Sequence, residues 1–369
     1  MIESPGFLFT VMAFLLVIGP LVFVHEMGHY LVARWFGTKV EKFSIGFGRE
    51  VLGWTDKRGT RWKVGWMPLG GYVQFKGDMN AASQPDPELA KLPEAERDGL
   101  FQFKPIWQRF LIILAGPMIN ILFAFVLFMG ILGTYGQAQN PAVVTALQEG
   151  LPADEAGFEL GDRIVGVDGR AVERFADLAT YVSLRPGQEM TFDVVRADTP
   201  VEIVVTTLDV TEADRFGNEA RIGRIGIYGT AIEMQSLSVV ELPGAALDQT
   251  VGGLEMIVVG LGQIISGQRS IEELGGPLKI GQISGQAASL GVYAFLVFMA
   301  MISINLGFIN LLPIPMLDGG HLVFYAAEAV RRKPIKPEAQ EWAFRMGLAV
   351  LLGFMVMVTV IDLRSFDLW

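Results

Sequence analysis

Long apolar stretches, separated by charged loops, dominate the pattern of hydrophobic and polar positions along this chain of 369 residues. Four of these stretches reach the roughly 20 helical residues that cross a hydrocarbon core about 30 Å thick. They lie near residues 7–36, 110–135, 292–312 and 342–361. The only charge before the first apolar run is Glu3, so this run lacks the basic start of a secretory signal and is predicted to be a retained span. The pattern therefore predicts four transmembrane helices.

The segments between the spans have different patterns. Aromatic and polar residues alternate over residues 51–75, and a turn signal lies at 56–59, which predicts a β-hairpin. Short alternating runs over 136–235 are typical of a mostly β domain, while 236–290 has an apolar helical face, which predicts amphipathic helices at the membrane surface. The predicted segments are 1–36, 37–105, 106–135, 136–235, 236–290, 291–330, 331–340, 341–362 and 363–369.

The charges predict which side of the membrane each loop faces. The chain has 29 Lys and Arg against 39 Asp and Glu, a net charge of −10, which argues against nucleic acid as a partner. Residues 34–104 hold twelve basic and nine acidic residues, and the short loop at 331–336 is strongly basic. Residues 136–290 hold ten basic and twenty-two acidic residues. Because basic loops stay cytoplasmic, both termini and the 136–235 domain are predicted to face outward.

Absent cysteine restricts any metal site to His, Asp and Glu ligands, and the chain has only three histidines. Two of them stand in the first span as His25-Glu26-Met27-Gly28-His29, an H-E-x-x-H motif. Residues four apart share one face of a helix, so His25 and His29 can bind one Zn²⁺ ion. Glu26 is then placed to take a proton from water and pass it to a leaving amine. Such polar groups within a span are costly and are normally functional.

The third zinc ligand is predicted at the end of the third span. Pro313 and Pro315 break that helix, and Asp318 follows the break. Eighteen residues separate Phe7 from His25 and also Val292 from Asn310, so two parallel spans carry both motifs to the same depth, about 27 Å from their start. We assign Asp318 as the third ligand.

Two further polar residues stand near that ligand. Asn310 is assigned to the substrate backbone or to the developing oxyanion, the alternative being a helix-to-helix hydrogen bond. His321 is the rival third ligand, and we favour a supporting role for it.

The two motifs together resemble the site-2 protease family of intramembrane zinc metalloproteases, whose pattern is H-E-x-x-H followed by N-x-x-P-x-P-x-L-D-G. Residues 310–319 complete the second motif. Residues 43–48 and 67–73 resemble the family's membrane-associated β-loop, and 103–105 with 115–120 resemble its second span.

The order of segments resembles the bacterial regulator-of-sigma-E branch. The resemblance implies a polytopic α-helical membrane protein in the bacterial inner membrane, with one catalytic Zn²⁺ near the cytoplasmic side and a periplasmic PDZ-like domain. It also implies cleavage within transmembrane segments of single-span proteins, such as anti-sigma factors or remnant signal peptides, after an upstream site-1 protease has trimmed them.

The exported domain resembles a single bacterial PDZ domain over residues 151–158 and 160–169, although relatives carry two such domains in tandem. Such domains bind extended peptides by strand addition. A bulky domain at the catalytic entrance could equally exclude substrates whose exported part has not been trimmed, and we slightly favour this size filter.

Two other functions are compatible with parts of the sequence. The first is a membrane-anchored PDZ adaptor whose zinc is structural, which would not need Glu26. The second is a membrane zinc protease that trims exposed tails. Such enzymes use a downstream glutamate as third ligand, so the segment ending in Asp318 argues against this function.

Overall fold

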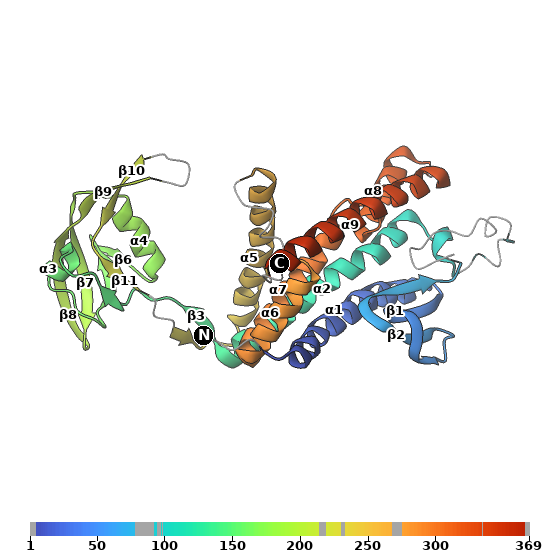
Figure 1. Ribbon diagram of the computed structural model, residues 1–369, viewed down its shortest axis with the longest axis horizontal. Helices are drawn as coiled ribbons and strands as arrows, with labels where there is room; N and C mark the ends of the chain where they lie inside the picture. Colours follow the sequence, from blue (N-terminus) through green and yellow to red (C-terminus); the bar gives the residue numbers. More distant parts are fainter. Residues whose placement is uncertain are drawn as a thin grey trace. The chain divides into compact units, whose positions relative to one another are not determined.

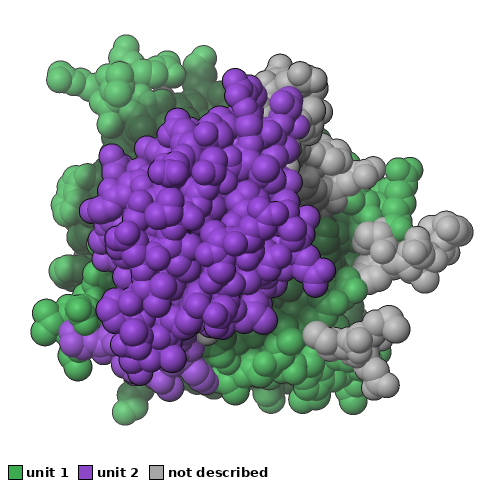
Figure 2. Space-filling model, turned by 90° about the vertical axis from the view of Figure 1, so that its left-hand side faces the viewer, with its two compact units in different colours: residues 1–131, 239–369 green, residues 132–238 purple. Residues whose placement is uncertain are grey.

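The computed structural model describes residues 5–77, 92–93, 97, 99–213, 219–229, 233–267, 275–333 and 335–365. The predicted C-terminal tail at 363–369 therefore lies partly outside the described residues. The chain forms two compact units, which Figure 2 distinguishes by colour. Unit 1 comprises residues 1–131 and 239–369, and unit 2 comprises residues 132–238.

Among the described residues, four helices of unit 1 are long and apolar enough to cross a membrane. They are α1 (Phe7–Trp35), α2 (Ile106–Tyr135), α7 (Val292–Leu311) and α9 (Pro337–Ser365), the last with its candidate span over Glu338–Arg364. Their number confirms the prediction, and Figure 1 shows α1, α2 and α7 next to one another. Helix α2 has the bounds of the predicted segment 106–135, whereas α9 begins several residues before its predicted span, because polar residues at its start extend the helix without adding to the apolar run.

Helices α1 and α7 run in the same direction. Val17 and Leu21 of α1 are fully buried against Met299 of α7, and the apolar residues around them belong to α1, α2 and α7. The outer sides of these helices keep large apolar side chains exposed, for example Leu16 at 58% and Leu122 at 51%. That exposure suits contact with lipid rather than water.

The predicted hairpin is longer than its sequence signal. Its strands are β1 (Val40–Thr55) and β2 (Arg61–Phe75). The first part of β1 pairs with both halves of β2, so that Phe43 lies opposite Val73 on one side and Trp62 on the other. The second half of β2 is therefore an edge, which pairs on its other side with no strand among the described residues. A short 3-10 helix, η3 (Phe101–Phe103), leads into α2.

The described part of unit 1 also contains the helices α5 (Leu242–Ile265), α6 (Pro277–Ser289) and α8 (Asp318–Arg331). Helix α6 packs along α1, and α5 contacts α7. The apolar residues predicted for one face of α5 differ in exposure: Leu254 and Ile257 are half-buried, whereas Leu247 and Val258 are more than half exposed. The fully buried positions include small residues, and one of them, Gly253, allows close packing on α7. A position of α5 and α6 at the membrane surface stays a prediction.

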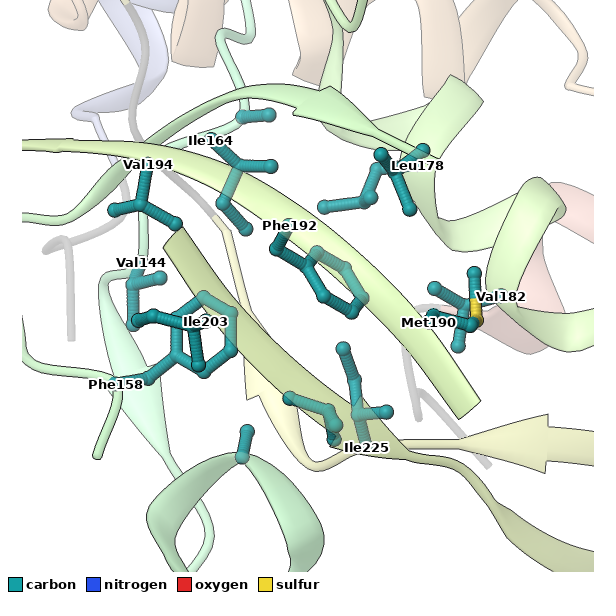
Figure 3. Packing of buried hydrophobic residues seen from close by; sticks show 14 residues of the cluster. Val144, Phe158, Ile164, Leu178, Val182, Met190, Phe192, Val194, Ile203 and Ile225 are labelled. Carbon is teal, nitrogen blue, oxygen red and sulfur yellow. The ribbon is translucent and has the colours of Figure 1, made fainter. Parts of the chain in front are cut away.

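Unit 2 is mostly β structure around one core. Its four-stranded sheet has the order β6-β5-β7-β8, and α4 flanks the core. Figure 3 shows Phe192 in the middle of this core, among Ile164, Leu178 and Ile203. The elements are β3 (Gln137–Gln139), β4 (Ala146–Leu147), α3 (Pro152–Glu155), β5 (Arg163–Val167), β6 (Arg170–Ala171), α4 (Phe175–Ser183), β7 (Glu189–Arg196), β8 (Thr199–Thr206), β9 (Leu208–Ala213), β10 (Glu219–Arg224), β11 (Ile227–Tyr228) and β12 (Glu233–Gln235).

In unit 2, an ion pair joins Asp162, the residue before β5, to Arg196 at the end of β7. Asp162 is fully buried, and both of its oxygens accept hydrogen bonds of 2.7 Å from Arg196. Burial alone would raise the pKa of Asp162, but the bonds from Arg196 and from the Glu159 amide lower that pKa below its ordinary value. The carboxylate therefore stabilises unit 2 only while it is ionised.

We expect Asp162→Asn to destabilise unit 2 by about 2 kcal/mol at neutral pH, because a charge-assisted pair is lost. Since the folded-state pKa lies below the unfolded one, this contribution is fully present above about pH 5 and is lost as the pH falls through the folded pKa. Hydrogen exchange of the β5 and β7 amides, corrected for intrinsic rates, measures it. Asp177→Asn, at the exposed Arg174 pair, is the control. Equal exchange in the Asp162 and Asp177 variants would contradict the prediction.

Candidate metal centre

The H-E-x-x-H motif lies within α1, and its histidines face each other across one helical turn. The Nε2 atoms of His25 and His29 are 3.3 Å apart, and both side chains are buried. Each ring is held from behind by α2, since His29 Nδ1 lies 2.9 Å from the Ile112 carbonyl oxygen and His25 Nδ1 lies 3.2 Å from the Asn120 side chain. The two Nε2 atoms are thereby directed to one point.

Asp318 reaches the same point from the chain that follows α7. After Leu311 the backbone leaves the helix, Met316 adopts a left-handed conformation (φ 87°), and α8 begins at Asp318. Gly319 and Gly320 allow the start of α8 to approach the carbonyl oxygens of residues 311, 312 and 314, where a Cβ would lie only 2.1 to 2.5 Å from them. This close return of the chain places the Asp318 carboxylate beside α1.

The three side chains fit a zinc ion. Asp318 Oδ2 lies 3.1 Å from His25 Nε2 and 3.5 Å from His29 Nε2, and the two Nε2 atoms are 3.3 Å apart. A tetrahedral ion with bonds of 2.0 to 2.1 Å has ligand atoms about 3.3 Å apart. The same oxygen is buried without a well-formed hydrogen bond among the described residues. A shared cation explains why these three atoms converge.

Glu26 lies beside this cluster but does not belong to it. Among the described residues, the group able to hold a metal comprises His25, His29 and Asp318. The Glu26 carboxyl is buried, and the backbone of Val73 in the edge strand is hydrogen-bonded to it. That position next to the metal ligands suits a proton acceptor better than a ligand.

A cavity of about 390 Å³ opens onto the cluster. Its walls come from α1, the edge half of β2, α7 and the start of α8, and they include Glu26, Tyr72, Asn310 and His321. The cavity is large enough for a few residues of an extended peptide. A peptide there would lie beside Glu26 and the zinc ligands.

The two remaining predicted residues lie in this cavity but outside the metal cluster. Asn310 donates from its side-chain nitrogen to the Leu306 carbonyl oxygen at 3.0 Å, within its own helix. His321 packs against Phe344 of α9, with ring centroids 5.0 Å apart. The structure thus brings Asp318, and not His321, to the two histidines of α1.

Sequence reasoning missed the contribution of α2. Asn120, Ile112 and Gly116 of this helix touch the two histidines. The segment 115–120 stood out only through the family pattern. An asparagine inside an apolar span was the available signal, because buried amides in spans need partners.

Comparison with known proteins agrees with this architecture. Residues 13–354 match the model of peptidase family M50. A protein of Agrobacterium fabrum named as a zinc metalloprotease is 41% identical over 360 residues, which is 96% of each chain. Metalloprotease MmpA of Caulobacter vibrioides is 38% identical over 393 residues, covering 99% of this chain and 98% of that one.

Among solved structures, the PDZ domain of an SdrC-like protein from Listeria monocytogenes covers 25% of this chain and 88% of its own, at 18% identity and a TM-score of 0.20. The PDZ-like interpretation of unit 2 therefore still depends on its sequence motifs.

The apolar helices, the cluster of His25, His29 and Asp318 that could hold a metal, and these relatives together define the class: the chain is a zinc metalloprotease of the membrane. It belongs to peptidase family M50, the site-2 protease family.

Proposed function

We propose that the enzyme is an intramembrane endopeptidase that hydrolyses peptide bonds within transmembrane segments of single-span membrane proteins. The depth of the metal cluster carries this proposal. His25 lies eighteen residues after Phe7, about 27 Å along the apolar helix α1, and the cluster lies between α1, α2 and the start of α8. A substrate that meets this site must bring a segment able to enter the bilayer.

Each residue of the site has a proposed role. Zinc, when bound by His25, His29 and Asp318, polarises the scissile carbonyl and makes water more acidic. Glu26 takes the proton from the attacking water and later donates it to the leaving amine. Asn310 turns its amide toward the developing oxyanion and donates to it.

The edge half of β2 is the proposed substrate clamp. Gly71, Tyr72 and Val73 line the cavity beside Glu26. A helical substrate must unwind before its peptide bond can be cut, and its freed backbone groups then need partners in the bilayer. An edge strand that pairs with no further strand among the described residues can supply those partners by strand addition. The other half of the hairpin, with Trp54 and Trp66 more than half exposed, suits the membrane interface.

We further propose that substrates arrive already trimmed by a site-1 protease, as anti-sigma factors and remnant signal peptides would be. In this proposal the PDZ-like unit excludes longer exported parts. Unit 2 also has an apolar cavity of about 260 Å³ beside α4, lined by Leu178, Val182 and Ile225. That cavity is where a peptide would bind if the unit were a ligand-binding domain instead.

The test uses purified full-length enzyme in liposomes. One set of single-span substrates carries short exported parts, and a matched set carries long ones. We expect cleavage inside the apolar segment of the short substrates only, mapped by mass spectrometry, with loss of activity on chelation and recovery with Zn²⁺. Cleavage confined to exposed tails would support the tail-trimming alternative. Equal cleavage of both sets would contradict the size filter but not the proposed cleavage within the membrane.

We propose that the protein lies in the bacterial inner membrane with both termini and unit 2 in the periplasm, and the metal centre toward the cytoplasm. The distribution of lysine and arginine supports this orientation. Because the chain has no cysteine, single cysteines report the side of each loop directly. We expect a membrane-impermeant thiol reagent added outside spheroplasts to label Ser183→Cys in unit 2 and to miss Arg332→Cys. The reverse pattern would contradict the orientation.

A further inference from the structure

Asn120 of α2 is a fully buried amide beside a zinc ligand. Its side-chain nitrogen lies 3.2 Å from His25 Nδ1, and its side-chain oxygen is buried with no hydrogen-bond partner among the described residues. A buried polar atom without a partner costs about 1 to 3 kcal/mol, so such an atom calls for a reason.

The chemistry of His25 supplies that reason. A neutral imidazole that binds a cation through Nε2 carries its proton on Nδ1, which makes Nδ1–H a donor. The side-chain nitrogen of Asn120 is also a donor, and two donors cannot form a hydrogen bond. Because the nitrogen and oxygen ends of an amide have almost the same shape, hydrogen bonding decides its orientation. Rotating the amide by 180° directs Oδ1 to His25 and gives this oxygen its partner.

His29 shows the same arrangement without any ambiguity. Its Nδ1 lies 2.9 Å from the Ile112 carbonyl oxygen, and a carbonyl can only accept. His29 therefore carries a proton on Nδ1, and in the neutral form that binds a cation its Nε2 is the nitrogen without a proton. Helix α2 thus contacts the Nδ1 atoms of both histidines, through Ile112 and Asn120, which lie about two helical turns apart.

Asn120 is itself held in place from the other side. The Ser303 hydroxyl of α7 donates to the Asn120 backbone oxygen at 2.7 Å, and both residues are fully buried. Gly307 of α7 leaves room for this contact, since a Cβ there would lie 2.8 Å from the Pro117 carbonyl oxygen. The backbone at Asn120 is consequently held against α7, while its side chain faces His25 of α1.

We propose that Asn120 is a positioning residue of the metal centre, whose side-chain oxygen accepts the Nδ1–H of His25 and so holds the tautomer that leaves Nε2 free for zinc. This inference rests on the proposed function, because it requires that His25 binds zinc through Nε2. In this proposal, α2 contributes to metal binding although no residue of α2 is a ligand. Partners of this kind typically contribute 10- to 100-fold to metal affinity.

The test compares Asn120→Leu, which removes the acceptor at similar size, with Asn120→Asp, which keeps it. Zinc affinity is measured on the full-length protein by chelator competition. We expect Asn120→Leu to weaken binding 10- to 100-fold and Asn120→Asp to stay within a few-fold of wild type. Glu255→Gln, at an exposed position of α5 away from the metal centre, is the control and should lie near wild type. Affinity as weak in Asn120→Asp as in Asn120→Leu would overturn the proposal.

A spectroscopic measurement separates positioning from a general effect on folding. The chain has three histidines, so ¹⁵N NMR of histidine-labelled apoprotein gives three pairs of ring signals, assigned with His29→Gln and His321→Gln. We expect His25 to be protonated on Nδ1 in the wild type and in Asn120→Asp, and to become a tautomer mixture in Asn120→Leu. An unchanged His25 signal in Asn120→Leu would also overturn the proposal.

One further variant separates failure of this inference from failure of the proposed function. If His25→Ala loses zinc while Asn120→Leu keeps both its affinity and its tautomer, the centre stands and only the positioning role falls. If His25→Ala binds zinc as the wild type does, the centre assigned to His25, His29 and Asp318 is wrong.

Discussion

Glu26→Gln is expected to stop peptide cleavage while leaving zinc bound. Glutamine has nearly the same shape and can keep the contact with the Val73 backbone, but it cannot take a proton from water. General acid and base catalysis by one side chain is typically worth 10²- to 10⁴-fold, so kcat should fall by about that factor. Turnover of the short single-span substrate in liposomes, together with zinc content per chain, measures both parts of the prediction.

The control for this variant is Glu255→Gln, which changes an exposed glutamate of α5 and should leave turnover and zinc content unchanged. Three results are informative. Normal turnover in Glu26→Gln would show that another group activates water. Loss of zinc would make Glu26 a ligand, against its position outside the cluster. Zinc retained without turnover would exclude a purely structural zinc site, and with it the adaptor function.

The ligand set could be predicted from the sequence because its geometry is local or set by span length. His25 and His29 are four residues apart on one helix, so periodicity alone puts their rings on the same face. The meeting of His25 with Asp318 is a long-range contact, yet two parallel spans of fixed rise bring both to one depth. The structure places their atoms 3.1 Å apart. Their roles as ligands stay a prediction until zinc binding is measured.

The contacts made by α2 could not be predicted in this way. Span lengths give the depth of a residue but not its rotation about the helix axis, so nothing in the sequence directs Asn120 toward His25 rather than toward lipid. The same limitation explains α5, whose exposed apolar residues outnumber its buried ones. In a soluble protein apolar residues mark the buried face, whereas next to lipid a buried face is selected by small size and close fit.

The hairpin shows a second limit. Alternation over 51–75 predicted two strands and a turn, but not that the first part of β1 would lie between the two halves of β2. A pattern with a period of two residues gives the face of a strand and leaves its neighbours undetermined. The edge position of Gly71 to Val73, on which the proposed clamp depends, therefore came from the structure.

Gly116→Ala is expected to disrupt zinc binding although residue 116 is not a ligand. A Cβ at this position would lie 2.2 Å from His29 Nε2, the atom that faces zinc. The ring cannot turn away without losing the contact of its other nitrogen with the Ile112 carbonyl. The alternative is a wider spacing of α1 and α2, which would open the close packing that Gly28 of α1 allows against the Ala115 carbonyl oxygen. We expect zinc affinity to fall at least about tenfold, with a loss of about 1 to 3 kcal/mol in stability from overpacking.

The same helix offers a matched control. Gly130 of α2 has nothing within 4 Å of its hypothetical Cβ, so Gly130→Ala adds the same methyl group to the same helix without touching α1. Chelator competition should give it wild-type zinc affinity, and its helix should be slightly more stable. Equal affinities in the two alanine variants would mean that α1 and α2 separate at little cost. In that case the close approach of Gly28 and Gly116 would not be what fixes His29, and the Ile112 carbonyl would have to hold the ring alone.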